Sequence, residues 1–177
     1  MNCPAWLAAA MIVAALNSSS TNDEPTQSRQ GGKYQIAAGK TYNIQAHAQS
    51  RLLQKYAALG ETVPADVVRE HADAIRFNTE AARKSYARLA KVAADNATLA
   101  KHVGQLQTRL DQVSAELQRM EDELSGDHAN SQAVIARAKE ISRRLNENHR
   151  DLRRIDNDFY NSDSDSYYAT GEGHFVD

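Results

Sequence analysis

Apolar residues recur with a three-four spacing along most of the middle of the chain. The alternation starts at Ile75 and continues without interruption through Asn78, Ala82, Ser85, Leu89, Val92, Asn96, Leu99, Val103, Leu106, Leu110, Val113, Leu117, Met120 and Leu124. A seven-residue repeat kept for about seven heptads is typical of a left-handed coiled coil. The pattern predicts a single helix over residues 64–125, roughly 90 Å long.

The same spacing returns after Ser125-Gly126-Asp127, which predicts a second helix over residues 128–159 with Asp127 or Asn130 as its N-cap. A linker this short forces the two helices into an antiparallel hairpin. We call the apolar positions that would pair in this hairpin the coiled-coil seam. It consists of Leu99, Val103, Leu106, Leu110, Val113, Leu117, Met120 and Leu124 on the first helix, and Val134, Ile141, Leu145, Leu152 and Ile155 on the second.

A shorter helix is predicted over residues 42–59, ending before Gly60. The short link that follows, with Pro64 at the start of the next helix, would fold this helix back onto the first part of the 64–125 spine. The predicted fold is therefore all-α: a long antiparallel coiled-coil hairpin with a shorter N-terminal helix on its spine. Asn96 falls at a seam position, where it would either be buried and fix the register or be half exposed near the end of the second helix.

The ends of the chain have a different composition. Residues 5–16 form an unbroken apolar run followed by Ser and Thr, which predicts a signal peptide over residues 1–20, cleaved after Ala15 or Ser20. No Lys or Arg precedes the run, so an N-terminal membrane tether is the alternative. Residues 21–40 are expected to form a flexible tether, residues 41–159 the three-helix domain, and residues 160–177 a disordered acidic tail. The predicted location is periplasmic or secreted.

Charge is unevenly distributed along the 177 residues. No Lys or Arg follows Arg154, and residues 1–155 hold 21 basic and 17 acidic side chains against a net charge of −2 for the whole chain. This balance does not indicate nucleic acid as a partner, and the apolar run is too short to form a stable membrane span. Cys3 is the only cysteine, which excludes an internal disulfide framework.

No catalytic, phosphate-binding or zinc-binding motif occurs in the chain, so we expect neither an enzyme nor a bound cofactor. The hairpin register places position 102 level with about position 151, which makes His102 and His149 weak candidates for a metal site. His47 and His71 lie on neighbouring predicted helices but roughly 9 Å apart along the axis. That separation is too large for the two to share an ion, and for His102 and His149 the alternative interpretation is that they are solvated residues beside the seam.

Five arginines make the end of the second hairpin helix basic: Arg143, Arg144, Arg150, Arg153 and Arg154. They could form a docking site for an anionic partner. The alternative is that they form ion pairs with Glu140, Glu147 and Asp151 at helical spacing and are stabilised by the negative, C-terminal end of the helix dipole.

The segment from Val63 to His71, continuing through residues 74–76 and 85–91, resembles a segment of uncharacterised exported helical proteins of environmental bacteria. The resemblance implies an exported coiled-coil hairpin with no assigned activity. Taken together, the predicted function is that of a non-enzymatic exported structural or interaction protein that acts through the coiled-coil seam and self-associates. The alternatives are a helical metal- or small-ligand-binding protein using His102 and His149, and a periplasmic holdase-type chaperone.

Overall fold

Four α-helices make up most of residues 24–160, the part of the chain that the computed structural model describes. They are α1 (Glu24–Ala57), α2 (Ala65–Val92), α3 (Ala97–Asp122) and α4 (Ser131–Ile155). A short stretch of π-helix, Asp156–Tyr160, continues α4. The all-α class predicted from the periodicity is confirmed.

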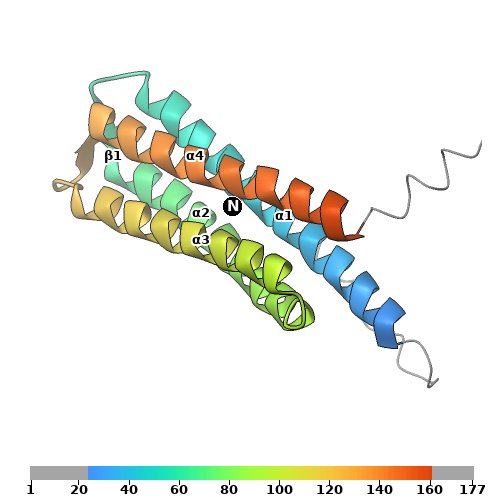
Figure 1. Cartoon of the computed structure of the whole chain (residues 1–177). Helices are drawn as coiled ribbons and strands as arrows, with labels where there is room; N and C mark the ends of the chain where they lie inside the picture. The colour runs from blue at the N-terminus through green and yellow to red at the C-terminus, as the bar shows by residue number, and fades with distance from the viewer. Residues whose placement is uncertain (1–23, 161–177) are drawn as a thin grey trace, which may run out of the picture.

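The helices form a bundle in which each one packs against two others (Figure 1). α1 lies against α2 and α4, and α3 lies against the same two helices. Because each link between successive helices is short, neighbouring helices run antiparallel. Both pairings expected from the sequence are therefore present: the N-terminal helix packs on the first part of the predicted spine, and α4 packs on its second part.

The prediction of one continuous spine helix over residues 64–125 is wrong. The chain leaves the helix after Val92 and starts α3 at Ala97, so the spine folds back on itself and no helix approaches 90 Å. Asn96 has neither of the two roles considered for it. It is exposed and caps α3, with its side-chain oxygen accepting a hydrogen bond from the Leu99 amide at 3.0 Å. The reversal replaces an extended rod with a four-helix bundle.

The tether expected over residues 21–40 is also wrong, because α1 begins at Glu24 and continues through all three glycines of this stretch. Two of them are contact positions. A Cβ on Gly32 would lie within 2.5 Å of three atoms of the Tyr160 side chain, and a Cβ on Gly39 would lie 2.6 Å from Cε1 of Tyr86. These glycines let α1 approach two aromatic rings closely, so they serve packing rather than flexibility.

The bundle core is built from the coiled-coil seam. All seam residues are buried except Leu124, which is partly buried against the others. The helices α1 and α2 complete the core with Ile36, Leu53, Ile75, Tyr86 and Leu89, each 0–1% exposed. At about 1.5–3 kcal/mol for each fully buried large apolar side chain, this interior is the dominant favourable contribution to folding.

A short β-ribbon ties two loops together at one end of the bundle (Figure 1). β1 (Thr62–Pro64), between α1 and α2, pairs antiparallel with β2 (His128–Asn130), between α3 and α4. The expected helix start at residue 128 is therefore wrong, because α4 begins at Ser131. Its N-cap is Asn130, which is one of the two caps that the sequence predicted. Gly126, at φ +63°, makes the turn before β2. The ribbon closes the bundle end by joining its two hairpins.

The predicted signal peptide over residues 1–20 and most of the acidic tail over residues 160–177 lie outside the described residues. Of that tail, Tyr160 is described, and it is buried against the core. Within the described helices, none combines the length and apolar character needed to cross a membrane.

Candidate functional site

The coiled-coil seam is the interior of a single chain. Its members from Leu99 to Met120 and from Val134 to Ile155 are at most 4% exposed. A partner could reach them only if the bundle opened, so the seam cannot serve as a docking surface in the folded state. A candidate interaction site must therefore be sought on the outer faces of the helices.

His102 and His149 face different neighbours. The expected register is close to the observed one, since the amide nitrogen of Asn148 donates to the carbonyl of Leu106 at 3.2 Å. His149 follows Asn148 by one position, which turns its side chain about 100° away from α3 and towards α1. His102 instead packs edge-on against Phe159, with the ring centroids 6.4 Å apart. The two histidines lie at about the predicted height along the bundle, but their side chains do not face each other as a shared metal site would require.

His149 lies with His47 in a small recess between α1 and α4. The recess has a volume of about 90 Å³ and is lined by Asn43, Ile44, His47, Leu145, Asn146 and His149. The predicted register placed His47 too far from His71 for the two to share an ion, and it missed this arrangement. His71 has a different partner, because its Nδ1 lies 2.9 Å from Oε1 of Gln49. Among the described residues, no group of three or more His, Cys, Asp or Glu side chains is placed to hold a metal ion.

Positive charge surrounds the recess. Burial lowers the pKa of His47 first, and the charges of Arg51 and of a protonated His149 lower it further. Burial is also the main cause that lowers the pKa of His149, followed by the charges of Arg153 and Lys40. Both histidines are therefore neutral at pH 7, in a setting where cations come from both helices.

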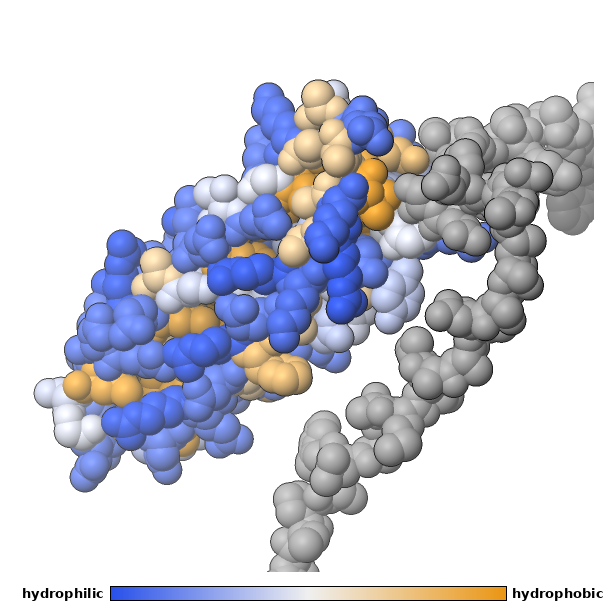
Figure 2. Space-filling model, turned by 90° about the horizontal axis from the view of Figure 1, so that it is seen from below, coloured by the Kyte–Doolittle hydropathy of each residue, from blue (hydrophilic) through white to orange (hydrophobic). Residues whose placement is uncertain are grey.

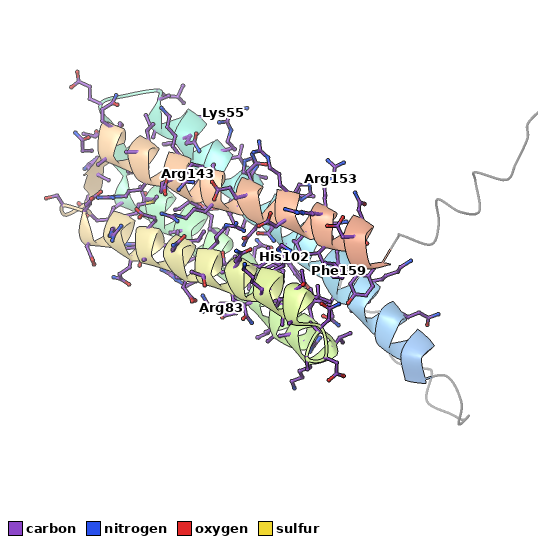
Figure 3. All side chains as sticks on the ribbon, in the orientation of Figure 1. Lys55, Arg83, His102, Arg143, Arg153 and Phe159 are labelled. Carbon is purple, nitrogen blue, oxygen red and sulfur yellow. The ribbon has the colours of Figure 1, made fainter. Side chains whose placement is uncertain are left out.

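The arginines of α4 divide into paired and unpaired members. Arg143 and Arg144 both bind Glu140, each with a nitrogen 2.6 Å from the carboxylate, and Arg154 lies 3.4 Å from Asp158. Hydrogen bonding to Arg143 is the main cause that lowers the pKa of Glu140. Arg150 and Arg153 make no ion pair with any residue from 24 to 160, and both are exposed. Figure 3 shows Lys55, Arg143 and Arg153 on one side of the bundle and Arg83 on the other.

The outer face of α1 carries most of the exposed large apolar side chains of the described part of the chain. They are Tyr34, Ile44, Leu52 and Tyr56 on the helix and Leu59 just after it, between 41% and 84% exposed. Helical spacing places them on one face together with Ala37, Thr41, Gln45 and Ala48, which are uncharged, and with Lys55 in the last turn of α1. We call this set the α1 stripe. By contrast, the view in Figure 2 shows hydrophobic colour only in small separate areas of a mostly hydrophilic surface.

A groove between α1 and α2 borders the α1 stripe. It has a volume of about 320 Å³, and its lining includes Tyr34, Tyr42 and Phe77 together with Lys84 and Arg88. Phe77 is 73% exposed, which is unusual for a phenylalanine on a helix that is otherwise apolar only on its buried face. The groove thus extends the apolar surface of α1 onto the neighbouring helix.

Buried polar groups fix how α1 sits on its neighbours. Oγ of Ser50 lies 2.6 Å from Oγ of Ser142, and Nε2 of Gln54 donates to that same hydroxyl and to the carbonyl of Ala138. Because buried polar groups are costly when unpaired, these bonds favour one register of α1 against α4. Their role is structural, and they hold the α1 stripe facing outward.

Comparison with family models, with curated proteins and with solved structures finds no significant match.

Proposed function

We propose that this chain is a non-enzymatic, exported interaction protein that associates with a second copy of itself through the α1 stripe. The observation that carries the proposal is the concentration of exposed apolar side chains on one helix of the described bundle. Scattered apolar residues are normal on a surface, whereas a contiguous apolar patch indicates an interface. Export is supported by the apolar run over residues 5–16 and the Ser- and Thr-rich stretch after it.

A second copy is the occupant that the composition of the stripe favours. Small side chains at Ala37 and Ala48 alternate with large ones at Ile44 and Leu52 on the same exposed face. In a two-fold dimer the same patch meets itself, so the large residues of one stripe can pack over the small residues of the other. The charge on this face, Lys55, lies in the last turn of α1, towards one end of the stripe.

The size of the stripe sets the expected affinity. From Tyr34 to Leu59 it is roughly 38 Å long, and at about 10 Å wide it offers on the order of 400 Å² per partner. A standard stable interface buries about 800 Å² per partner. The groove beside Tyr34 adds to the area, but we still expect a dimer that dissociates on dilution rather than an obligate one.

The test is the solution mass of the full chain, measured by light scattering over a dilution series. We expect the dimer mass at high protein concentration and the monomer mass on dilution. The double variant Ile44→Glu/Leu52→Glu should stay monomeric, because each Glu would place a charge at the centre of the interface. Ala115→Glu, at an exposed position of α3, is the matched control and should dimerise as the natural chain does.

All three proteins carry the same first twenty residues, so association through that segment would be equal in all of them. Circular dichroism would check that the double variant keeps its helices. The proposal is wrong if the natural chain is monomeric at every concentration, or if the double variant dimerises as strongly as the control.

A further inference from the structure

The groove between α1 and α2 is bordered by aromatic rings from both helices. Tyr34 and Tyr42 come from α1 and Phe77 comes from α2, around a volume of about 320 Å³. Tyr34 is 59% exposed and Phe77 is 73% exposed. Large aromatic side chains contribute most to binding when a partner covers them. The rings of this groove therefore favour an occupant that has apolar or aromatic side chains of its own.

The same groove carries two cations that have no ion-pair partner in the described part of the chain. Lys84 and Arg88 lie one turn apart on α2, line the groove and are exposed. The nearby ion pairs of α2 are made instead by Arg83, with Glu80 at 3.2 Å and with Asp111 at 2.8 Å. Glu80, the carboxylate in the groove lining, is thus already paired. The groove favours an occupant that is acidic as well as aromatic.

Residues 161–177 of this chain, which lie outside the described residues, have this composition. They contain four acidic residues, no Lys or Arg, and three aromatic residues. Asp163 and Asp165 come first, and Tyr167 and Tyr168 follow directly after them. Two carboxylates and two aromatic rings therefore occur within six residues.

The described chain ends close to this groove. Tyr160 packs against Gly32 of α1, where a Cβ would lie 2.3 Å from the tyrosine hydroxyl oxygen, and Figure 1 shows the end of α4 beside the N-terminal half of α1. Helices α1 and α2 are antiparallel, since Gly39 lies against Tyr86 whereas Gln49 bonds to His71 further down the pair. The end of the groove nearest to Gly32 is therefore its cationic end.

The order of the chemistry is the same along the groove and along the segment. A chain that leaves Tyr160 meets Arg88 and Lys84 first and Phe77 farther along, because residue numbers on α2 fall with distance from Gly32. In the segment, the acidic pair likewise precedes the aromatic pair. Charge and aromatic character thus match in sequence as well as in kind.

The segment is long enough to reach. Crossing half of a helix about 10 Å wide takes roughly 16 Å, and advancing from Arg88 to Phe77 takes roughly another 16 Å along the axis. The diagonal of these two paths is roughly 23 Å. The eight residues from Tyr160 to Tyr168 span up to about 26 Å when extended, so Tyr168 can lie over Phe77.

We propose that residues 161–168 fold back onto their own chain and dock in the groove between α1 and α2. The two aspartates pair with Lys84 and Arg88, and the two tyrosines cover the exposed rings. Tyr34 also belongs to the α1 stripe, so the docked segment competes with a second copy for that end of the stripe. The docking itself does not rest on the proposed dimer.

The exposed arginines of α4 match this segment less well. Arg150 and Arg153 also make no ion pair within the described residues. The large apolar side chains that are exposed in the described part of the chain lie on α1, just after it and on α2, so α4 has no exposed ring to offer the tyrosines. These two arginines therefore serve as the control.

The test is NMR of the full chain with a nitroxide spin label on the variant Ser166→Cys, in which Cys3→Ser removes the natural cysteine. The label should remove the backbone amide signal of Ala81 in the groove and leave that of Gln112. Gln112 is the reference because it lies on α3 at about the same height, next to the Asp111 that binds Arg83. A segment that stays free would broaden both signals to similar extents.

Matched variants separate the two parts of the contact. Lys84→Gln/Arg88→Gln should lower the equilibrium constant for docking roughly fivefold, the modest effect expected for two exposed ion pairs. Arg150→Gln/Arg153→Gln removes the same charge from α4 and should leave the broadening of Ala81 unchanged. Phe77→Ala should weaken docking roughly tenfold, because it removes the exposed ring. Leu59→Ala, at an 84% exposed position outside the groove, should have no effect.

A mixed sample distinguishes docking within one chain from docking between chains. Spin-labelled chains without ¹⁵N are combined with ¹⁵N-labelled chains without a spin label, all carrying Ile44→Glu/Leu52→Glu so that the α1 stripe does not bring them together. Loss of the Ala81 signal in this sample would show docking between chains. Because the stripe is disabled in every chain, the result does not depend on whether the proposed dimer exists.

Four results would overturn the proposal. They are equal broadening of Ala81 and Gln112, broadening centred on the α4 arginines instead of the groove, equal weakening by the two double arginine and lysine variants, and loss of the Ala81 signal in the mixed sample. Circular dichroism of each variant would check that the helices are intact.

Discussion

The packing of α1 on Tyr86 gives the sharpest test of the fold, because two glycine-to-alanine substitutions with the same gain in helix propensity should differ in their effect on stability. Gly39 lies in α1 with Cε1 of Tyr86 only 2.6 Å from where a Cβ would be. Gly104 lies in α3, and a Cβ added there would meet nothing within 4 Å. Both residues are inside helices, so the gain in helix propensity is the same for both.

The expected magnitudes follow from these contacts. Replacing glycine by alanine inside a helix stabilises the folded state by about 0.8–1.0 kcal/mol when the methyl group is free of contacts. At Gly39 the methyl group would press on a ring that is 0% exposed and hydrogen-bonded to Asn43, so the ring has no room to move aside. Forcing an extra carbon into a filled core costs about 1–3 kcal/mol. We expect Gly104→Ala to stabilise by about 1 kcal/mol and Gly39→Ala to be 1–3 kcal/mol less stable than Gly104→Ala.

Thermal unfolding followed by circular dichroism is the assay. For a chain of this size, about 1 kcal/mol corresponds to a shift in Tm of about 2–4 °C. A double-mutant cycle isolates the contact: in a Tyr86→Leu background the shorter side chain leaves space, so Gly39→Ala should regain the stabilising effect seen at Gly104. If Gly39→Ala stabilises the natural chain as much as Gly104→Ala does, α1 does not pack on Tyr86 in the way described.

Three further outcomes are expected. Asn96→Ala should lower the free energy of unfolding in urea by about 1 kcal/mol, because it removes the N-cap of α3, and no change would argue against the turn before that helix. Leu145→Ala should cost about 2–5 kcal/mol in the same assay, against less than about 0.5 kcal/mol for Leu52→Ala on the exposed stripe, and equal effects would contradict the assignment of core and surface. The pKa values of His47 and His149 are lowered from 6.5 in the folded state, so the unfolded chain takes up protons first and stability should fall as the pH drops below about 7. Changing both histidines to Gln should flatten this pH dependence in a series of melting curves.

The sequence determined the faces of the helices, because each face follows from local periodicity. The three-four spacing identified nearly every buried position of α3 and α4, and the short linker after Leu124 determined that they form an antiparallel hairpin. The sequence also predicted correctly that α1 packs against α2, and it identified Asn130 as a possible N-cap of α4. These features depend on residues close together in the chain, where spacing and turn length leave few alternatives.

Only the tertiary structure decided where the spine reverses. The heptad phase passes through residues 93–96 undisturbed, so periodicity alone predicts a continuous helix. Folding back lets the apolar faces of α2 and α3 share one interior with α1 and α4, which buries more surface than a two-stranded rod. Asn96 then becomes a cap because an exposed turn needs one, a role that its position in the repeat does not reveal.

The same reason explains the other differences. Judged only by their neighbours in the sequence, Gly32 and Gly39 indicate a flexible segment. They are nevertheless helical, because two tyrosines from distant parts of the chain pack against them. His149 has the predicted height along the bundle but faces α1, because the reversal of the spine brings α1 alongside α4. The sequence alone thus determines which residues share a helix face, and the contacts between distant segments determine which neighbour that face meets.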